Sequence, residues 1–308
     1  MESYFAISRP EGVSTPLERP PYHDRWYPDR LTGRLTFHLT TLPGSFVSSS
    51  TGHLVLGELD SRQVVALEAI RSRGCPVLPG TGIKGAVRTL YELLSSSCDP
   101  FQSSACTVPK DKTRMRLCPA CSLFGRLDWQ GRVTFSDAEP VGPVEAFIAK
   151  VPTPFEPHED QTKGDQRHYN LGPAKKKNKD TSEWEERPED FPREVYRGTF
   201  QTTLSFWNTS QDEMGRLLLC MGLQPDGSPR FHLRLGGATY HGKGGVAVEP
   251  RELMLLHRSG ASGLGSLEKE DSPTPSLASW MRGLCASESF QPYLSTWNEL
   301  AAKLEATS

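Results

Sequence analysis

The stretch "VLPGTGIKGAVRTLYELL" (residues 77–94) decides the fold, because it places three glycines and two basic residues at the start of a helix. Its apolar side chains recur at helical spacing, at Ile83, Val87, Leu90 and Leu94. This spacing predicts an amphipathic helix with one buried face. We expect Thr81 to be the N-cap residue, since its hydroxyl can accept a hydrogen bond from an unpaired backbone N–H. Lys84 and Arg88 lie four residues apart and therefore flank the buried face together.

The start of this helix has the chemistry of an anion site. Free backbone N–H groups at a helix N-terminus attract anions, and phosphate is the common biological one. Gly82 and Gly85 allow another backbone to approach closely. The stretch is not a nucleoside triphosphate P-loop, because no Gly-Lys-Ser/Thr follows at the required spacing. For these residues alone, an ordinary capped helix with two solvated basic side chains is the simpler interpretation.

The composition is that of a globular protein with many loops. The chain has 308 residues, a formal net charge of −2, 27 glycines, 25 prolines and seven cysteines. The balanced charge excludes a globally basic protein but not a local basic stripe. We expect no membrane span and no signal peptide, and therefore a cytoplasmic protein, because no long apolar run is present. In such a chain, cysteines indicate metal ligands or free thiols rather than disulfides.

The order of the expected elements predicts an α+β fold. Strands are expected over 34–42, 131–141, 198–208 and 230–250, the last with a glycine-rich turn, and helices over 77–94 and 210–224. The segment 43–63 is expected to be a loop. The resulting order is strand, helix, strand, strand, helix, strand. This is the ferredoxin-like, or RRM-like, βαββαβ arrangement, in which two helices cover a four-stranded antiparallel sheet.

Other segments flank or interrupt this core. The domain plan is a Pro-rich N-terminal arm (1–32), the core (33–250) and a C-terminal linker with helices (251–308). Two insertions interrupt the core: a cysteine-containing one over 95–122 and a long, charged one over 142–195. We expect 259–276 to be a Ser/Gly/Pro linker and the tail to end in an amphipathic helix.

Four cysteines of the first insertion have the spacing of a metal site. Cys118 and Cys121 form a Cys-Pro-Ala-Cys pair, and Cys98 and Cys106 lie just upstream. Four thiolates satisfy tetrahedral, structural zinc. We expect the insertion to be too polar to form a hydrophobic core of its own, so a bound metal ion would organise it. A redox pair and unbound surface thiols are alternatives, and His53 or a neighbouring histidine is an alternative to Cys98. The other cysteines are expected to be core or near-core thiols: Cys75, Cys220 and Cys285.

Three segments together resemble one known family. They are "LPGTGIKGAVRTLYE" (78–92), "CPACSLFGR" (118–126) and "LGGATYHGKGGVAVEP" (235–250). In this order they resemble the repeat-associated mysterious protein (RAMP) superfamily, and within it the backbone subunits of type III CRISPR effector complexes. The resemblance covers about residues 33–250. It implies three kinds of partner: a CRISPR guide RNA, a target RNA and the other subunits of a ribonucleoprotein complex.

The resemblance also implies residues that contact RNA. In the two glycine-rich segments these are Gly80, Thr81, Lys84, Arg88, His241, Lys243 and Gly244. The long insertion would be the family's thumb, which wedges between bases of the guide–target duplex. Its expected contacts are Arg167, His168, Tyr169, Lys175, Lys176 and Lys177. A plain hairpin turn is the alternative for the glycine loop, and a solvated loop tip is the alternative for the lysines.

An aspartate in the loop before the first helix cuts target RNA in some subunits of this branch. Asp60 in "LGELD" corresponds to it, with Glu58 a poorer candidate, and Mg²⁺ or another divalent ion would be the cofactor. Two alternatives stay open. One is a non-catalytic scaffold subunit of the same complex. The other is a metal-independent, guide-processing endoribonuclease that uses His38, His53 or His241 as a general base.

Overall fold

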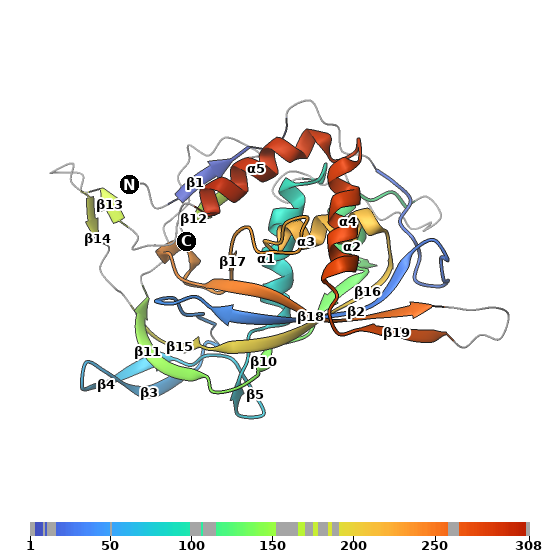
Figure 1. The fold of residues 1–308 in the computed structure, drawn as a ribbon. Helices are drawn as coiled ribbons and strands as arrows, with labels where there is room; N and C mark the ends of the chain where they lie inside the picture. Colours follow the sequence, from blue (N-terminus) through green and yellow to red (C-terminus); the bar gives the residue numbers. More distant parts are fainter. Residues whose placement is uncertain are drawn as a thin grey trace.

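The computed structural model is a mixed α+β protein whose sheets are mostly antiparallel (Figure 1). The residues described are 4–8, 10, 17–49, 51–98, 106, 115–151, 166–169, 175–177, 184–186, 191–257 and 265–305. Within these residues, no helix is long and apolar enough to cross a membrane.

The largest sheet forms the centre of the molecule. Its strands follow the order β10, β16, β2, β18, β17, and every pair in it is antiparallel. Their bounds are Glu139–Pro140, Thr199–Thr209, Leu31–Thr41, Gly245–His257 and Leu233–Arg234. Two further strands join this sheet: β9 (Val133–Phe135) pairs with β16, and β19 (Ser266–Glu270) pairs with β18. On β2, alternation of buried apolar and polar residues gives the sheet one apolar face.

Helices cover one face of this sheet (Figure 1). They are α1 (Gly80–Leu93), α2 (Pro119–Phe124), α3 (Gln211–Cys220), α4 (Thr274–Ala286) and α5 (Gln291–Glu305). Helix α3 begins with a capping box, in which the Ser210 hydroxyl accepts from the Glu213 N–H and the Glu213 carboxylate accepts from the Ser210 N–H. Gly215 allows α3 to pack closely on α4, because a Cβ at this position would lie 2.6 Å from the Trp280 carbonyl oxygen.

A second sheet lies on the other side of the central sheet in Figure 1. Its order is β11, β15, β4, β3, with bounds Glu145–Val151, Phe191–Arg197, Arg62–Leu67 and Leu54–Leu59. Strands β11 and β15 are the two ends of the long insertion, so this insertion begins and ends as paired strands. Strand β4 joins β15 in parallel, which attaches the β3–β4 hairpin to the base of the insertion.

Short strand pairs and one 3-10 turn complete the described structure. The pairs are β1 (Tyr4–Ile7) with β12 (Gln166–Tyr169), β13 (Lys175–Lys177) with β14 (Trp184–Glu186), β5 (Arg71–Ser72) with β6 (Cys75–Pro76), and β7 (Gly125–Arg126) with β8 (Trp129–Gln130). The turn η2 (Thr239–His241) lies between β17 and β18.

Several expectations about local structure are confirmed. The expected strands over 34–42 and 198–208 correspond to β2 and β16, and the helix expected over 210–224 is α3 with Ser210 as its cap. The amphipathic helix expected at the end of the chain is α5.

Other expectations were wrong, each for a physical reason. The segment 43–63 contains β3 and the start of β4, because the hairpin pairs with a strand that follows it by more than a hundred residues. Thr81 lies inside α1 rather than at its cap. The N-cap is Pro79, and the Asp137 carboxylate accepts the Gly80 N–H at 2.8 Å. The linker expected over 259–276 contains β19 and the start of α4.

The cysteine-containing insertion and Cys75 also need correction. The described part of this insertion is not too polar to bury a core, since Met115 and Leu117 are fully buried. Cys75 is exposed in a short hairpin instead of lying near the core, whereas Cys220 is buried and Cys285 is half-buried as expected.

Candidate nucleic-acid interface and metal centre

Two cavities meet where α1 begins, and we call them together the glycine groove. The first, of about 300 Å³, lies between α1, the loop after β2 and the glycine-rich loop. The second, of about 440 Å³, lies between α1, β17 and η2. Gly82 and Gly236 line both cavities, so the two lie side by side. The groove therefore brings together the two glycine-rich segments, which are more than 140 residues apart in the sequence.

One wall of the groove is the bare backbone of α1. A Cβ atom added at Gly82 or Gly85 would have nothing within 4 Å, and both residues are exposed. Thr81 and Thr89 are exposed on the same wall. Glycine inside a helix costs about 0.5–1 kcal/mol relative to alanine. These two glycines therefore reduce the stability of α1 and leave room for a ligand to reach its backbone.

The opposite wall carries cationic and ionisable side chains. His232 and Arg234 are two residues apart, and both line the larger cavity. Burial lowers the pKa of Arg234 to about 10, so its guanidinium stays charged at neutral pH. Burial also lowers the pKa of His232, which favours the neutral imidazole. In the smaller cavity, Arg193 from β15 lies beside Gly237.

A second group of glycines holds the groove in shape. A Cβ at Gly80 would overlap with the carbonyl oxygen of Phe135, and a Cβ at Gly244 would overlap with that of Leu235. Gly244 also has a φ of 83°, a left-handed conformation that favours glycine. Gly80 and Gly244 were expected to contact RNA. Their surroundings give them a packing role within the protein.

The expected basic contacts on α1 differ from one another in their surroundings. Lys84 is half-buried, and burial together with the nearby Arg88 lowers its pKa. The Arg88 guanidinium lies against α2, where it donates to the Glu92 carboxylate at 2.7 Å and to the Gly125 carbonyl oxygen at 3.0 Å. Arg88 lines neither cavity. The Glu92 carboxylate balances the charge of the Arg88 guanidinium, so Arg88 is not among the proposed RNA contacts.

The other expected RNA contacts lie in the glycine-rich loop and the long insertion. Lys243 donates to the Gly44 carbonyl oxygen at 3.0 Å and lies 5.6 Å from the centroid of the Phe46 ring, so it ties two loops together. His241 belongs to η2, and its side chain lies outside the described residues. The same holds for the side chains of Arg167, His168 and Tyr169 on β12 and of Lys175, Lys176 and Lys177 on β13.

Asp60 lies at the tip of the β3–β4 hairpin. Asp60 and Ser61 have φ values of 50° and 61°, as in a two-residue turn between antiparallel strands. The Asp60 side chain is 80% exposed, and its Oδ2 is 3.9 Å from Nζ of Lys150. Among the described residues, Asp60 belongs to no group of three or more potential metal ligands.

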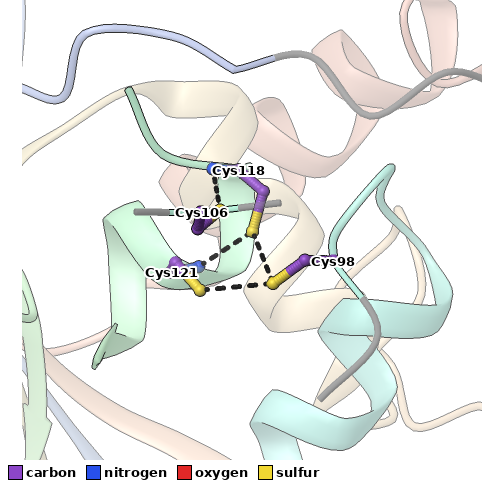
Figure 2. A group of neighbouring side chains, drawn as sticks. All are labelled: Cys98, Cys106, Cys118 and Cys121. Carbon is purple, nitrogen blue, oxygen red and sulfur yellow. Dashed lines mark hydrogen bonds between the residues drawn. The ribbon is translucent and has the colours of Figure 1, made fainter. Parts of the chain in front are cut away.

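The four cysteines predicted as metal ligands come together in one cluster (Figure 2). Their sulfur atoms all lie within 4.8 Å of one another, and the Cys98 Sγ is 3.6 Å from that of Cys118 and from that of Cys121. Tetrahedral zinc with Zn–S bonds of about 2.3 Å requires sulfur atoms about 3.8 Å apart. The donor set and its spacing therefore fit a structural zinc ion.

The local backbone supports the same assignment. Cys118 is the N-cap of α2, and its Sγ accepts from the Cys121 N–H at 3.4 Å. The Cys106 Sγ accepts from the Cys118 N–H at 3.1 Å. Hydrogen bonds among the thiols lower the pKa of Cys118 and raise the pKa of Cys98 and of Cys121, so one thiolate of the cluster is stabilised by its neighbours. Three of the four cysteines are buried, so the site is closed and suits a structural role.

Sequence reasoning missed Arg193, His232 and Arg234. The segment "RFHLRLGG" (230–237) alternates polar and apolar residues directly before the glycine-rich loop. This alternation places His232 and Arg234 on the same side of the chain. The two residues could therefore have been predicted as candidate site residues from the sequence. No comparable signal marks Arg193, which reaches the groove because β15 pairs with β4.

Comparison with known families matches residues 38–246 to the model of the RAMP superfamily. The chain belongs to this superfamily. No curated protein matches the chain. Among solved structures, it is similar to a chain of a "Type IV-B CRISPR Complex", with 14% sequence identity and a TM-score of 0.34. This similarity covers 75% of the present chain and 92% of the other.

Proposed function

We propose that this protein is the guide-RNA-binding backbone subunit of a type III CRISPR ribonucleoprotein effector. The observation that carries the proposal is the glycine groove, in which the two glycine-rich segments of a RAMP superfamily chain face each other across a cavity with cationic walls. Its partners would be the guide RNA, the target RNA and neighbouring subunits.

The strand order supports a ferredoxin-like core. Taken in chain order, β2, the β9–β10 segment, β16 and β18 are strands one to four, and the sheet places them in the order two, three, one, four. Helix α1 follows strand one and helix α3 follows strand three. We therefore propose the βαββαβ arrangement expected from the sequence, with two insertions and a helical tail added.

In this proposal, the groove holds the sugar-phosphate backbone of the guide. Arg193 and Arg234 supply positive charge, and Gly82 and Gly85 admit the strand to the backbone of α1. Sequence would be read by pairing between guide and target, while the protein recognises backbone and shape. Binding should weaken steeply with salt, because phosphate contacts release counterions. Lys84, Thr81, His241 and Lys243 border the groove or its loop and remain proposed contacts.

The long insertion remains the proposed thumb. Its basic and aromatic residues on β12 and β13 would contact the guide–target duplex, as expected from the family resemblance. Strands β11 and β15 would form its rigid base, since all seven of their paired positions are in register.

The cysteine cluster would hold Zn²⁺ through Cys98, Cys106, Cys118 and Cys121. A bound zinc ion would supply a closed tetrahedral centre without chemistry of its own. It would fix α2 against the end of α1, where Arg88 already joins the two helices.

Asp60 remains the proposed residue for cleavage of the target RNA. Its exposed carboxylate at a hairpin tip can accept a hydrogen bond from a ribose hydroxyl and orient it toward the adjacent phosphate. The protein offers no further metal ligands among the described residues near it, so RNA would have to complete any divalent site. A non-catalytic scaffold subunit is the second candidate, because the isolated carboxylate is not built into a cluster.

RNA binding is tested with a pair of matched variants. Gly85→Leu fills the groove from α1, whereas Gly283→Leu makes the same change on α4, also where a Cβ has nothing within 4 Å. We expect both chains to fold, because a Cβ at either position would have no atom of another described segment within 4 Å. We expect the wild-type chain and Gly283→Leu to co-purify with RNA that shares a constant 5′ segment, and Gly85→Leu to lose it. Equal RNA content in all three would contradict the proposed groove.

Cleavage is tested separately with Asp60→Ala in the assembled complex. We expect guide binding to be unchanged and divalent-dependent cutting of a paired target to be lost. If the complex with Asp60→Ala still cleaves the target, Asp60 is not the catalytic residue and the result favours a non-catalytic scaffold subunit. Metal-independent cutting of a precursor guide by the isolated chain would instead support the guide-processing alternative.

A further inference from the structure

We propose that His232 contacts the ribose 2′-hydroxyl of a bound nucleotide and makes the glycine groove select RNA over DNA. This inference rests on the proposed RNA-binding function and adds to it a specificity-determining residue. It concerns the larger cavity of the groove, between α1 and β17.

His232 lies in the lining of the larger cavity, where a ligand can reach it. His232 and Arg234 face it from one side, and the bare backbone at Gly82 and Gly85 faces it from the other. A strand that enters this space meets the exposed backbone of α1 at Gly82 and Gly85, beside Ala86 and Thr89, together with the polar groups of His232 and Arg234. The polar part of this lining suits the sugar-phosphate edge of a nucleic acid.

The two polar groups are suited to different parts of one nucleotide. The charged Arg234 guanidinium is a donor that matches phosphate. His232 is two residues away on the same side of the chain, so it reaches the neighbouring sugar when Arg234 holds a phosphate.

The imidazole of His232 has one nitrogen available for a ligand. Its Nδ1 is buried and has no hydrogen-bond partner among the described residues. Nε2 is therefore the atom that can meet a bound group at the cavity. Burial keeps the ring neutral, so Nε2 acts either as a donor or as an acceptor, depending on the tautomer.

A ribose 2′-hydroxyl satisfies both tautomers, because it can donate and accept. A deoxyribose offers neither function at that position and would leave Nε2 unpaired in a partly buried site. An unpaired polar group in such a site costs more than the hydrogen bond gains. The groove should therefore disfavour DNA even though Arg234 attracts the phosphates of both nucleic acids.

The test compares two labelled single strands on the full-length chain, an oligouridine RNA and the matching 2′-deoxy strand. The wild-type protein should bind the RNA about tenfold more tightly than the DNA at equal salt. His232→Phe keeps the ring size but removes both nitrogens. It should weaken RNA binding about three- to tenfold and leave DNA binding unchanged, so that selectivity is lost. His257→Phe, on an exposed histidine outside the groove, is the matched control.

The outcomes separate this inference from the function on which it rests. If the wild-type chain binds neither strand, the proposed function fails. If it binds both strands equally, or if His232→Phe changes RNA and DNA binding by the same factor, RNA binding stands and the role of His232 is overturned. The wild-type comparison needs no folded variant, so misfolding of His232→Phe would leave the inference falsifiable.

Discussion

The two sides of helix α1 differ in how closely the rest of the protein packs against them. On the side toward α2, Tyr91 is fully buried, and Arg88 bonds both to Glu92 and to the end of α2. On the side toward the groove, a Cβ at Gly82 or Gly85 would have no atom of another described segment within 4 Å. One helix thus carries stability on one face and keeps the other face open for a ligand.

The glycines divide in the same way. Gly80 and Gly244 lie where a Cβ would overlap with a carbonyl oxygen, so the fold itself requires them. Gly82 and Gly85 lie where a Cβ would meet no other described segment within 4 Å, so the fold does not require glycine there. Glycines that look equivalent in the sequence are therefore present for opposite physical reasons: some are required by packing and others leave space open. Substitutions at the two kinds of glycine test this difference.

The largest effect is expected at the cysteine cluster on the closed side. Cys118→Ser removes one of four ligands and the N-cap sulfur of α2. We expect loss of tightly bound zinc and a fall in the free energy of unfolding of about 5 kcal/mol or more, because metal binding is coupled to folding. Metal analysis and chemical denaturation measure the two quantities. Cys75→Ser, at an exposed cysteine outside the cluster, should change neither. A wild-type chain purified without any metal would contradict the zinc assignment.

The next largest effect is expected at Arg132, which is fully buried on the same side. Its guanidinium is paired with Glu213 and donates to the Asn208 carbonyl oxygen at 2.7 Å. Arg132→Met should cost about 3–5 kcal/mol, because it removes the main partner of a buried carboxylate. Urea denaturation gives the value. Arg251→Met, which breaks an exposed pair with Glu249, should cost less than about 1 kcal/mol. Similar losses for both variants would show that Glu213 is satisfied without Arg132.

A smaller loss is expected at the crowded glycines of the groove. Gly244→Ala forces a side chain into a left-handed conformation and against the Leu235 carbonyl oxygen. We expect a loss of about 1–3 kcal/mol in the free energy of unfolding. Gly237→Ala is the control in the same loop, since its Cβ would have only ordinary contacts, the nearest at 3.7 Å. Thermal melting of both variants decides the matter, and equal melting temperatures would refute the packing role of Gly244.

The smallest effect, and one of opposite sign, is expected at the open glycines. Gly85→Ala should raise the free energy of unfolding by about 0.5–1 kcal/mol, because alanine is the better helix former and has room. The same variant should weaken RNA binding, since its methyl group enters the groove. Gly283→Ala on α4 should give the same gain in stability with no change in RNA binding. A variant at Gly85 that gains stability and binds RNA normally would separate this glycine from the ligand site.

Local sequence signals predicted much of the fold and part of the site. The periodicity of α1 and α3, the capping box at Ser210 and the alternation of β2 are properties of neighbouring residues, so they could be found without the tertiary structure. The grouping of the cysteines was also predictable, because two of the four are fixed by the Cys-Pro-Ala-Cys spacing on one helix start. The cap at Thr81 failed because Asp137, far along the chain, takes the first N–H of α1.

The sequence by itself determined which segments are amphipathic, where the glycines gather and which thiols can share a metal ion, since these depend on residue type and short spacing. Only the tertiary structure decided that Arg88 donates to the end of α2 and does not line the groove, that a Cβ at Gly80 would be crowded while one at Gly82 would not, and that His232 and α1 line one cavity. The physical reason is that the surroundings of a side chain come from segments that pack against it, and most of those lie far away in the chain.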